Sequence, residues 1–339
     1  MRIGNLDSDE KVIVIAEIGN NHEGSFEVAR EMVDRAAEAG ADAVKFQTFK
    51  TETFVAPTQV ERYERMQGFE LTQDKFAKLA ERARSAGIKF ISTPLDMPSA
   101  VFLDNIVDAL KIASGDNTFY PLIDFVAGTH KPMIISTGFA DEPEIALATA
   151  MVETARAGRA NGSQMAFLHC VSAYPVAPED ANIGAIHRLR DRFGATATIG
   201  YSDHTLGTLA ATLSIAAGAR IIEKHFTLDR HYSNFRDHQL SADPEMMTVL
   251  VNAIRETEAL MGDGSLAPRQ VERDSESSVR RSIAATRGLQ AGDVVGPKDI
   301  MWIRPGEGIA PGREAEVLGR VLKKPVHPGD LFATDDFAI

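Results

Sequence analysis

The sequence predicts an α/β fold, a closed (β/α)8 barrel followed by a small, mostly β domain. From residue 11 to about 262, short apolar runs alternate with helical patterns. Eight such units in about 250 residues fit a closed parallel barrel. Near residue 263 the sequence becomes polar, charged and rich in serine, which is typical of a linker, and helical periodicity ends beyond it. These changes divide the chain into a barrel domain (1–262), a linker (263–281) and a C-terminal domain (282–339).

The repeating unit is clearest near the N-terminus. KVIVIAEIG (11–19) predicts a buried strand, and SFEVAREMVDRAAEAG (25–40) has a serine cap, helical apolar spacing and a terminal glycine. A Rossmann-type open sheet is disfavoured, because no GxGxxG follows the first strand and no GxxxxGK[ST] occurs. Seven further strands are predicted at AVKFQTF, KFISTP, ALKIAS, MIISTG, MAFLHC, ATIGYSD and RIIEKHFT.

Two other segments stand out. A long polar insertion at 49–71 follows the second predicted strand, and long loops in compact domains are often lids or binding loops. In the C-terminal domain, RGLQAGDVVGPKDI (287–300) and KPVHPGDLFATDDF (324–337) share a β-run, a turn with Gly-Asp and an apolar pair. This similarity indicates an internal pseudo-repeat.

Composition excludes several classes of protein. The net charge of -12 over 339 residues argues against nucleic acid or an anionic membrane as partner. It also means that an anionic substrate requires a locally basic pocket. A single cysteine, Cys170, excludes an intrachain disulfide framework. No apolar stretch reaches the ~18 residues of a membrane helix, and the N-terminus lacks an apolar signal core, so we expect a cytoplasmic protein.

Barrel enzymes carry their reactive groups at the C-terminal ends of the strands. Polar residues occupy nearly every such position here, and their shared rim favours a site, although each alone has an ordinary structural interpretation as a hydrogen-bonding group. The candidates are Glu17, Asn20, His22, Glu23, Lys45, Gln47, Ser92, Thr93, Lys111, Ser114, Asp116, Ser136, Thr137, His169, Ser202, Asp203, His204, Glu223 and His225.

His204 and His225 end the last two predicted strands. Neighbouring strands lie ~4.8 Å apart, so two imidazoles at the same level can share one metal ion. The alternative is two buried histidines bonded to backbone groups. Glu223 lies on the same strand face as His225 and is suited to orient a ligand. His169 is a weaker candidate for a third ligand.

Lys45 and Lys111 lie within predicted strands. A lysine pointing outward beneath a helix is costly, so both are expected to point into the barrel. With Ser114, Ser136 and Ser202 they predict a pocket for a small ligand with several negative charges, which phosphoenolpyruvate satisfies. A Schiff-base aldolase remains an alternative use of one such lysine.

Several motifs together resemble one family over nearly the whole chain. The segments AEIGNNHEGSFEVAREMVDRAAEAGADAVKFQT, KIASGD, PMIISTG, LHCVSAYP, IGYSDHTLG and IEKHFTLDR are similar to the sialic acid synthase (N-acetylneuraminate synthase) family. RGLQAGDVV, DIMWIRPGEG and GRVLKKPVHPGDLF resemble its antifreeze-like (SAF) domain. The resemblance implies a TIM barrel with a SAF domain. It also implies a transferase that condenses phosphoenolpyruvate with an amino-sugar aldehyde, giving a nonulosonic acid and phosphate.

The resemblance also implies roles for individual residues. Glu23 corresponds to a catalytic carboxylate beside a divalent metal ion, Mn2+ with Mg2+ or Co2+ as alternatives, which His204 and His225 bind. Arg304 corresponds to an arginine that reaches the partner subunit's active site, which implies a domain-swapped homodimer. The positions that match contacts to phosphoenolpyruvate and nearby substrate groups are Lys45, Gln47, Lys111, Ser114, Ser136 and Ser202; those on the acceptor side are Asp116, Tyr174 and Asp237.

Asp237 is a candidate second catalytic carboxylate, with a loop residue that caps the last helix as the alternative. Three departures from the family pattern lie on the acceptor side. Asp116 stands where Glu is usual, Ser172 replaces Asn or Thr, and 231–244 differs from a GPD-containing stretch and adds His238. The acceptor therefore stays open between N-acetylmannosamine, a diacetamido-trideoxyhexose and a less common hexose. Two rivals remain, a synthase that joins phosphoenolpyruvate to a phosphorylated aldose and a non-catalytic sugar-binding protein.

Overall fold

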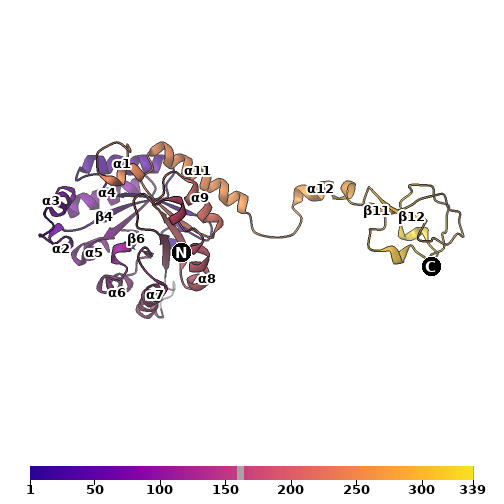
Figure 1. Cartoon of the computed structure of the whole chain (residues 1–339), viewed down its shortest axis with the longest axis horizontal. Helices are drawn as coiled ribbons and strands as arrows, with labels where there is room; N and C mark the ends of the chain where they lie inside the picture. The colour runs from indigo at the N-terminus through magenta and orange to yellow at the C-terminus, as the bar shows by residue number, and fades with distance from the viewer. Residues whose placement is uncertain (159–163, 339) are drawn as a thin grey trace. The chain divides into compact units, whose positions relative to one another are not determined.

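The computed structural model describes residues 1–158 and 164–338 of the chain. The chain divides into two compact units, Met1–Gly262 and Asp263–Ile339. Each unit has its own hydrophobic core. Figure 1 shows a ring of helices around a central set of strands in the first unit.

The first unit is a closed barrel of eight parallel strands in the order β10-β3-β4-β5-β6-β7-β8-β9. The barrel closes where β10 pairs in parallel with β3, and in this register His225 lies opposite Glu17. The predicted fold class is confirmed. The barrel strands are β3 (Ile13–Gly19), β4 (Ala43–Thr48), β5 (Lys89–Pro94), β6 (Ala109–Ile112), β7 (Met133–Ser136), β8 (Met165–Cys170), β9 (Thr198–Asp203) and β10 (Ile221–His225). A short hairpin of β1 (Arg2–Ile3) and β2 (Leu6–Asp7) precedes them.

Several of the helices that follow the strands begin at a side chain that caps the first turn, namely Ser25, Thr72, Asp96, Asp141 and Asp243. In the first helix the hydroxyl of Ser25 accepts from the backbone N–H of Val28, as the sequence predicts. The helices that cover the barrel are α1 (Phe26–Glu38), α4 (Gln73–Ser85), α5 (Met97–Leu103), α6 (Tyr120–Gly128), α7 (Glu142–Arg156), α8 (Ala185–Phe193), α9 (Leu209–Ala216) and α11 (Pro244–Met261).

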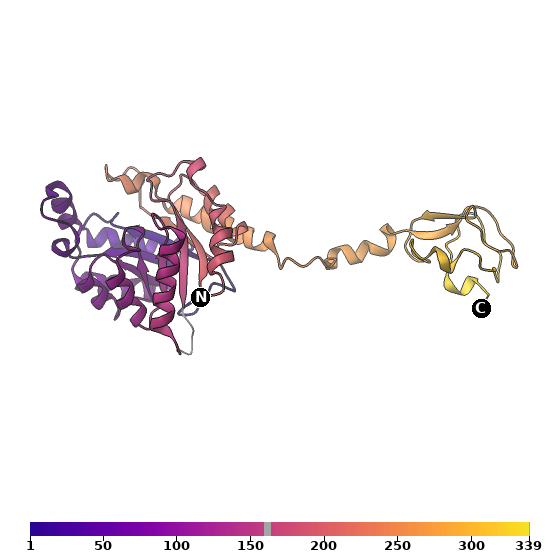
Figure 2. The same cartoon turned by 60° about the horizontal axis from the view of Figure 1, so that its bottom comes forward.

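The insertion after the second barrel strand is largely helical rather than an irregular loop. It contains α2 (Thr51–Phe54) and α3 (Val60–Phe69), whose apolar residues pack around a small cluster of Phe49, Val55, Met66 and Leu95. In Figure 2 these helices and the short α10 (Arg236–Leu240) lie at the end of the barrel away from the N-terminus. They therefore stand above the C-terminal ends of the strands.

The barrel interior consists of two layers with different chemistry. Since side chains alternate along a strand, one residue in two points inward. The layer nearer the N-terminal ends is apolar and fully packed, with Ile13, Ile15, Ala43, Ile91, Ala109, Ile134, Ala166, Leu168 and Ile221. Two residues further along several strands, the inward positions are polar or charged: Glu17, Lys45, Thr93, Lys111, Ser136, Ser202 and Glu223. The apolar layer is thus the floor of a polar one.

One lysine does point outward beneath the helices. Lys224 of β10 is completely buried, and its Nζ lies 2.8 Å from Oδ2 of Asp203 on β9. The other oxygen of Asp203 accepts from the hydroxyl of Tyr201 and from both the N–H and the hydroxyl of Thr205. This ion pair ties β9 to β10 at the level where His204 and His225 leave the strands.

The second unit is small and mostly extended. It begins with α12 (Gln270–Val279), so part of the stretch predicted as a linker is helical. The strands β11 (Ser282–Ala285) and β12 (Ile300–Ile303) pair antiparallel, and isolated bridges join Leu289 to Val326 and Val294 to Val321. The core of the unit consists of Ile283, Ala285, Leu289, Val295, Ile300, Ile309, Val317, Leu322, Val326, Phe332 and Phe337.

Within the ranges that the structure describes, no helix combines the length and the hydropathy that crossing a bilayer requires.

Replacing Lys224 with Met should lower the free energy of unfolding by about 3–5 kcal/mol, because Asp203 is then left buried without its cation. Urea unfolding followed by circular dichroism measures this change. Arg2→Met is the control, because it breaks an ion pair with Asp7 in which the Arg2 side chain is 72% exposed. The urea midpoint of this variant should hardly change. Equal effects of the two variants would contradict the role of the buried pair.

Candidate active site

The polar layer of the barrel is a chain of ion pairs between four buried side chains. Nζ of Lys45 lies 2.9 Å from Oε2 of Glu17 and 3.7 Å from Oε2 of Glu223. Nζ of Lys111 lies 3.7 Å from Oε1 of Glu223 and donates to Oγ of Ser136 at 2.6 Å. The structure therefore places both lysines inside the barrel, on opposite sides of one carboxylate.

Burial and neighbouring charges decide the protonation of these groups. Burial raises the pKa of Glu17 to about 7, although Lys45 opposes this shift. Burial acts in the same direction on Glu223, but Lys111 and Lys45 outweigh it and lower the pKa of that carboxyl. Burial lowers the pKa of Lys111, and Glu223 counteracts part of this effect. Near pH 7, the ammonium group of Lys45 thus faces the ionised carboxylate of Glu223 and a second carboxyl, Glu17, that takes up a proton readily, which suits an anionic ligand.

Serine hydroxyls surround this layer. Ser202 donates to Oε1 of Glu223 at 2.8 Å. A Cβ on Gly138 would lie 2.6 Å from Oγ of Ser114 and 2.4 Å from Oγ of Ser172, so only glycine allows the two hydroxyls to approach this backbone. Asp116 follows Ser114 in a short 3-10 turn, and burial raises its pKa to about 6.

The two predicted metal-binding histidines lie side by side. The rings of His204 and His225 are 5.3 Å apart between centroids. Nδ1 of His204 lies 2.9 Å from the carbonyl oxygen of Val171, which leaves Nε2 as the nitrogen with a free lone pair. Burial, and then the neighbouring His204 and Lys45, hold the pKa of His225 well below its ordinary value, so its imidazole is neutral.

These features fit a divalent metal ion. Nδ1 of His225 is buried and has no hydrogen-bond partner among the described residues, which is unusual unless the ring serves another purpose. In the same residues no three His, Cys, Asp or Glu side chains converge on a point. His204 and His225 could hold the ion as two protein ligands, and water or substrate oxygens would complete its coordination.

A cavity of about 940 Å³ opens beside His225. Asp237 lies in an ion pair with Arg236, Nε to Oδ1 3.3 Å, and burial raises its pKa although Arg236 opposes the shift. The guanidinium of Arg236 stacks over the ring of Tyr174 at 4.7 Å. The cavity lining includes Asn20, Glu23, Gln47, Arg62, Arg65, Phe69, Tyr174, His225, Ser233, Arg236 and Asp237. Six of the predicted residues, Asn20, Glu23, Gln47, Tyr174, His225 and Asp237, thus line one cavity together with three arginines.

Some of the sequence-based expectations need correction or completion. His169 is not beside the histidine pair, because its ring stacks on Tyr201 and its Nε2 lies 2.9 Å from the carbonyl oxygen of Ala181. Arg304 belongs to the second unit, where its Nε donates to the carbonyl of Val279, and its place in a partner subunit stays a prediction. The sequence also did not reveal that Glu17 pairs with Lys45. The two-residue spacing of Glu17 from Ile15 could have indicated that its side chain points into the barrel.

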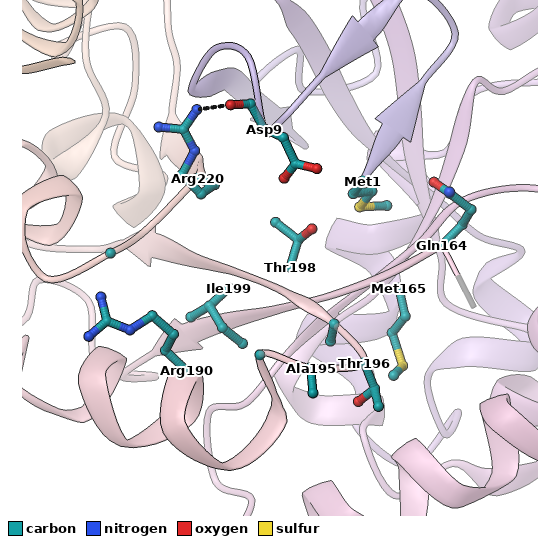
Figure 3. Close-up of a pocket in the computed structure, with 13 residues that line it drawn as sticks. Met1, Asp9, Gln164, Met165, Arg190, Ala195, Thr196, Thr198, Ile199 and Arg220 are labelled. Atoms are coloured by element: carbon teal, nitrogen blue, oxygen red, sulfur yellow. Dashed lines mark hydrogen bonds between the residues drawn. The ribbon is translucent and has the colours of Figure 1, made fainter. Parts of the chain in front are cut away.

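A second cavity, of about 400 Å³, lies beside the N-terminal end of the barrel (Figure 3). Arg220 points into this region from the segment before β10 and donates to the backbone carbonyls of Ser8 and Asp9. The lining of this cavity includes Thr198 and Arg190 but none of the residues predicted to take part in chemistry. Polar contacts at this end of a barrel commonly serve stability.

Two protein-family models match the chain, one over most of the first unit and one over most of the second. The model of the NeuB family matches residues 32–266. The chain belongs to the NeuB family. The SAF domain model matches residues 280–338 of this NeuB-family chain, so its second unit is a SAF domain.

Individual relatives of this NeuB-family chain match it over nearly its full length. An uncharacterized protein of Methanocaldococcus jannaschii is 43% identical, covering 96% of this chain and 95% of its own length. An N,N'-diacetyllegionaminic acid synthase of Legionella pneumophila is 40% identical, covering 93% and 92%. A crystal structure of an N-acetylneuraminic acid synthetase from Leptospira borgpetersenii superposes with a TM-score of 0.75 at 34% identity, covering 81% of this chain and 94% of that one. The Legionella and Leptospira proteins are named as synthases of nonulosonic acids, and this chain is an enzyme of the same transferase type.

Proposed function

We propose that the protein condenses phosphoenolpyruvate with the open-chain aldehyde of an amino sugar, giving a nonulosonic acid and inorganic phosphate. The observation that carries this proposal is the pair Lys45 and Lys111, buried in a polar layer below His204 and His225. Two ammonium groups in a closed barrel suit a ligand with a carboxylate and a phosphate. The relatives named as legionaminic and sialic acid synthases support an amino-sugar acceptor, N-acetylmannosamine or a diacetamido-trideoxyhexose.

The lysines and serines hold phosphoenolpyruvate, and the cavity above holds the acceptor. This arrangement turns a bimolecular encounter into a reaction between positioned groups, which contributes several kcal/mol to lowering the barrier. A divalent metal ion on His204 and His225, Mn2+ in the first instance, would polarise the acceptor carbonyl. Tyr174 and the Arg236–Asp237 pair then limit the space in which the acceptor lies.

Two carboxyl groups, those of Asp237 and Glu23, carry out the proton transfers. C3 of phosphoenolpyruvate attacks the aldehyde carbon, and the aldehyde oxygen becomes a hydroxyl by taking a proton, for which Asp237 is the candidate donor. The raised pKa of Asp237, due first to burial, supports this role. Water then adds to C2 and passes a proton to Glu23. The new C2 hydroxyl then gives its proton to the departing phosphate as the bond between C2 and the phosphate oxygen breaks, which yields the 2-keto acid and inorganic phosphate.

The proposal includes a homodimer in which Arg304 of the SAF domain serves the active site of the partner subunit. Support comes from the exposed guanidinium of Arg304 and from the acidic groups of the cavity, Glu23 and Asp237, as well as from the family resemblance.

The first test is phosphate release from phosphoenolpyruvate with Mn2+ and a panel of 2-acetamido and diacetamido hexoses. Glu23→Gln should lower kcat by about 10²–10⁴-fold, because the water loses its base, while phosphoenolpyruvate still binds. Glu27→Gln, an exposed change on α1, is the control and should remain near wild type. Turnover only with arabinose 5-phosphate or erythrose 4-phosphate would favour the phosphorylated-aldose reaction. Failure to release phosphate with every acceptor, despite bound metal, would favour a sugar-binding protein.

Metal binding can be tested without turnover. Wild-type protein stripped with a chelator should bind Mn2+ in an electron paramagnetic resonance titration, and His204→Ala combined with His225→Ala should abolish this binding, because both imidazole ligands are lost. His187→Ala, an exposed histidine on α8, should bind as wild type does. Retained binding in the double variant would remove the histidine pair from the metal site.

The exchange of Arg304 between subunits can be tested by mixing variants. Glu23→Gln and Arg304→Ala chains are each expected to be weak, the second through poorer acceptor binding. Unfolded, mixed in equal amounts and refolded, they should recover about a quarter of wild-type activity, since half of the dimers then hold one intact site. No recovery would place Arg304 in its own subunit's site or outside it.

A further inference from the structure

The carboxylate of Glu23 is held by a buried histidine from the last loop of the barrel. His238 lies on α10 and is completely buried, and its Nε2 lies 3.1 Å from Oε1 of Glu23. On the other side of the ring, Nδ1 lies 2.7 Å from Oγ1 of Thr227, just beyond β10. Thr227, His238 and Glu23 therefore form a hydrogen-bonded row that ends in the cavity.

One proton must lie between His238 and Glu23 whichever way the row is arranged. The hydroxyl of Thr227 has a single proton and is within reach of both Nδ1 and the carbonyl oxygen of Asp229, at 3.1 Å. If it donates to Nδ1, then Nε2 carries the proton and donates to the carboxylate. If it donates to Asp229, Nδ1–H donates to Thr227, and a hydrogen bond across the 3.1 Å between Nε2 and Glu23 again needs a proton between them.

Both described partners of the Glu23 carboxylate contact the same oxygen. Oε1 accepts from the hydroxyl of Ser233 as well as from His238. Oε2 has no partner among the described residues, and the side chain is 24% exposed into the cavity. The two hydrogen bonds thus orient the carboxylate and leave Oε2 as the oxygen that can meet water.

Aromatic rings hold His238 in place and keep water from it. The ring of Tyr232 lies 5.2 Å from His238, and that of Phe235 lies 6.1 Å away, edge-on. Phe235 in turn packs edge-to-face against Phe69 at the end of α3, with 5.2 Å between centroids. The histidine is therefore fixed by packing as well as by hydrogen bonds, as a group that orients another must be.

We propose that His238, held by Thr227, is a positioning residue that orients Glu23 so that Oε2 meets the water added during the reaction. This assignment rests on the proposed function, in which Glu23 accepts the proton of that water. His238 itself does not touch the substrate in this scheme and acts through Glu23 alone. Its effect should fall on kcat and leave the affinity for phosphoenolpyruvate unchanged, because that ligand lies on the buried lysines.

Two conservative substitutions separate positioning from general stability. In His238→Gln the amide nitrogen can take the place of Nε2 and still donate to Glu23, whereas in His238→Asn it reaches only the place of Nδ1. We expect His238→Asn to lower kcat by about 10–100-fold with an unchanged Kd for phosphoenolpyruvate, and His238→Gln to restore most of the loss. His231→Asn, an exposed histidine of the same loop, is the matched control and should behave as wild type.

A double-mutant cycle tests whether the effect passes through Glu23. In the Glu23→Gln background, His238→Asn should cause no further loss of kcat, since the group that it orients is already absent. If His238→Asn prevents folding, Thr227→Val supplies a second route, because it removes the hydroxyl and keeps the shape. A loss that adds fully to that of Glu23→Gln, or equal losses in the Asn and Gln variants, would overturn the proposal.

Crystal structures give a readout that does not need turnover. In His238→Asn the carboxylate of Glu23 should turn away from its wild-type orientation, and in His238→Gln it should stay. A wild-type enzyme that forms no product with any acceptor would overturn the proposed function, and the crystal structures would still decide the positioning role. An unmoved carboxylate in His238→Asn would reject His238 even in an active enzyme.

Discussion

The buried ion pairs between Lys45, Glu17, Glu223 and Lys111 are the constraint on which the active end of the barrel depends. An ammonium group removed from water is costly unless a carboxylate compensates it. The strands must therefore supply both charges at one level, above an apolar floor that excludes water. The same arrangement keeps the charges of the layer close to balance, and the raised pKa of Glu17 lets it take up a proton near pH 7.

This local balance explains how a chain of net charge -12 can hold an anionic substrate. The field of the whole protein repels anions at long range, but screening by salt weakens it beyond about 10 Å. Inside the barrel, two ammonium groups and several serine hydroxyls act over a few ångströms and in a medium of lower polarisability. Binding is therefore decided by the polar layer and not by the overall charge.

Barrel closure brings together groups that are far apart in the sequence. Because β10 pairs with β3, the loop after the last strand meets the loop after the first, and His238 contacts Glu23 across 215 positions. The insertion helix α3 reaches the same place through Phe69 and Phe235. One wall of the cavity is thus assembled from three connections that lie far apart in the sequence.

The sequence by itself determined the eight-stranded barrel, the SAF domain and the family, because strand and helix periodicities and the motifs are local patterns. It also indicated that Lys45 and Lys111 point inward, since alternation along a strand is local too. Only the tertiary structure decided which groups pair. Glu17 with Lys45, Lys224 with Asp203 and His238 with Glu23 depend on strand register and loop packing, and His169 took an outward position that its place at a strand end did not reveal. Contacts of this kind join residues that no short segment contains, so no local pattern can specify them.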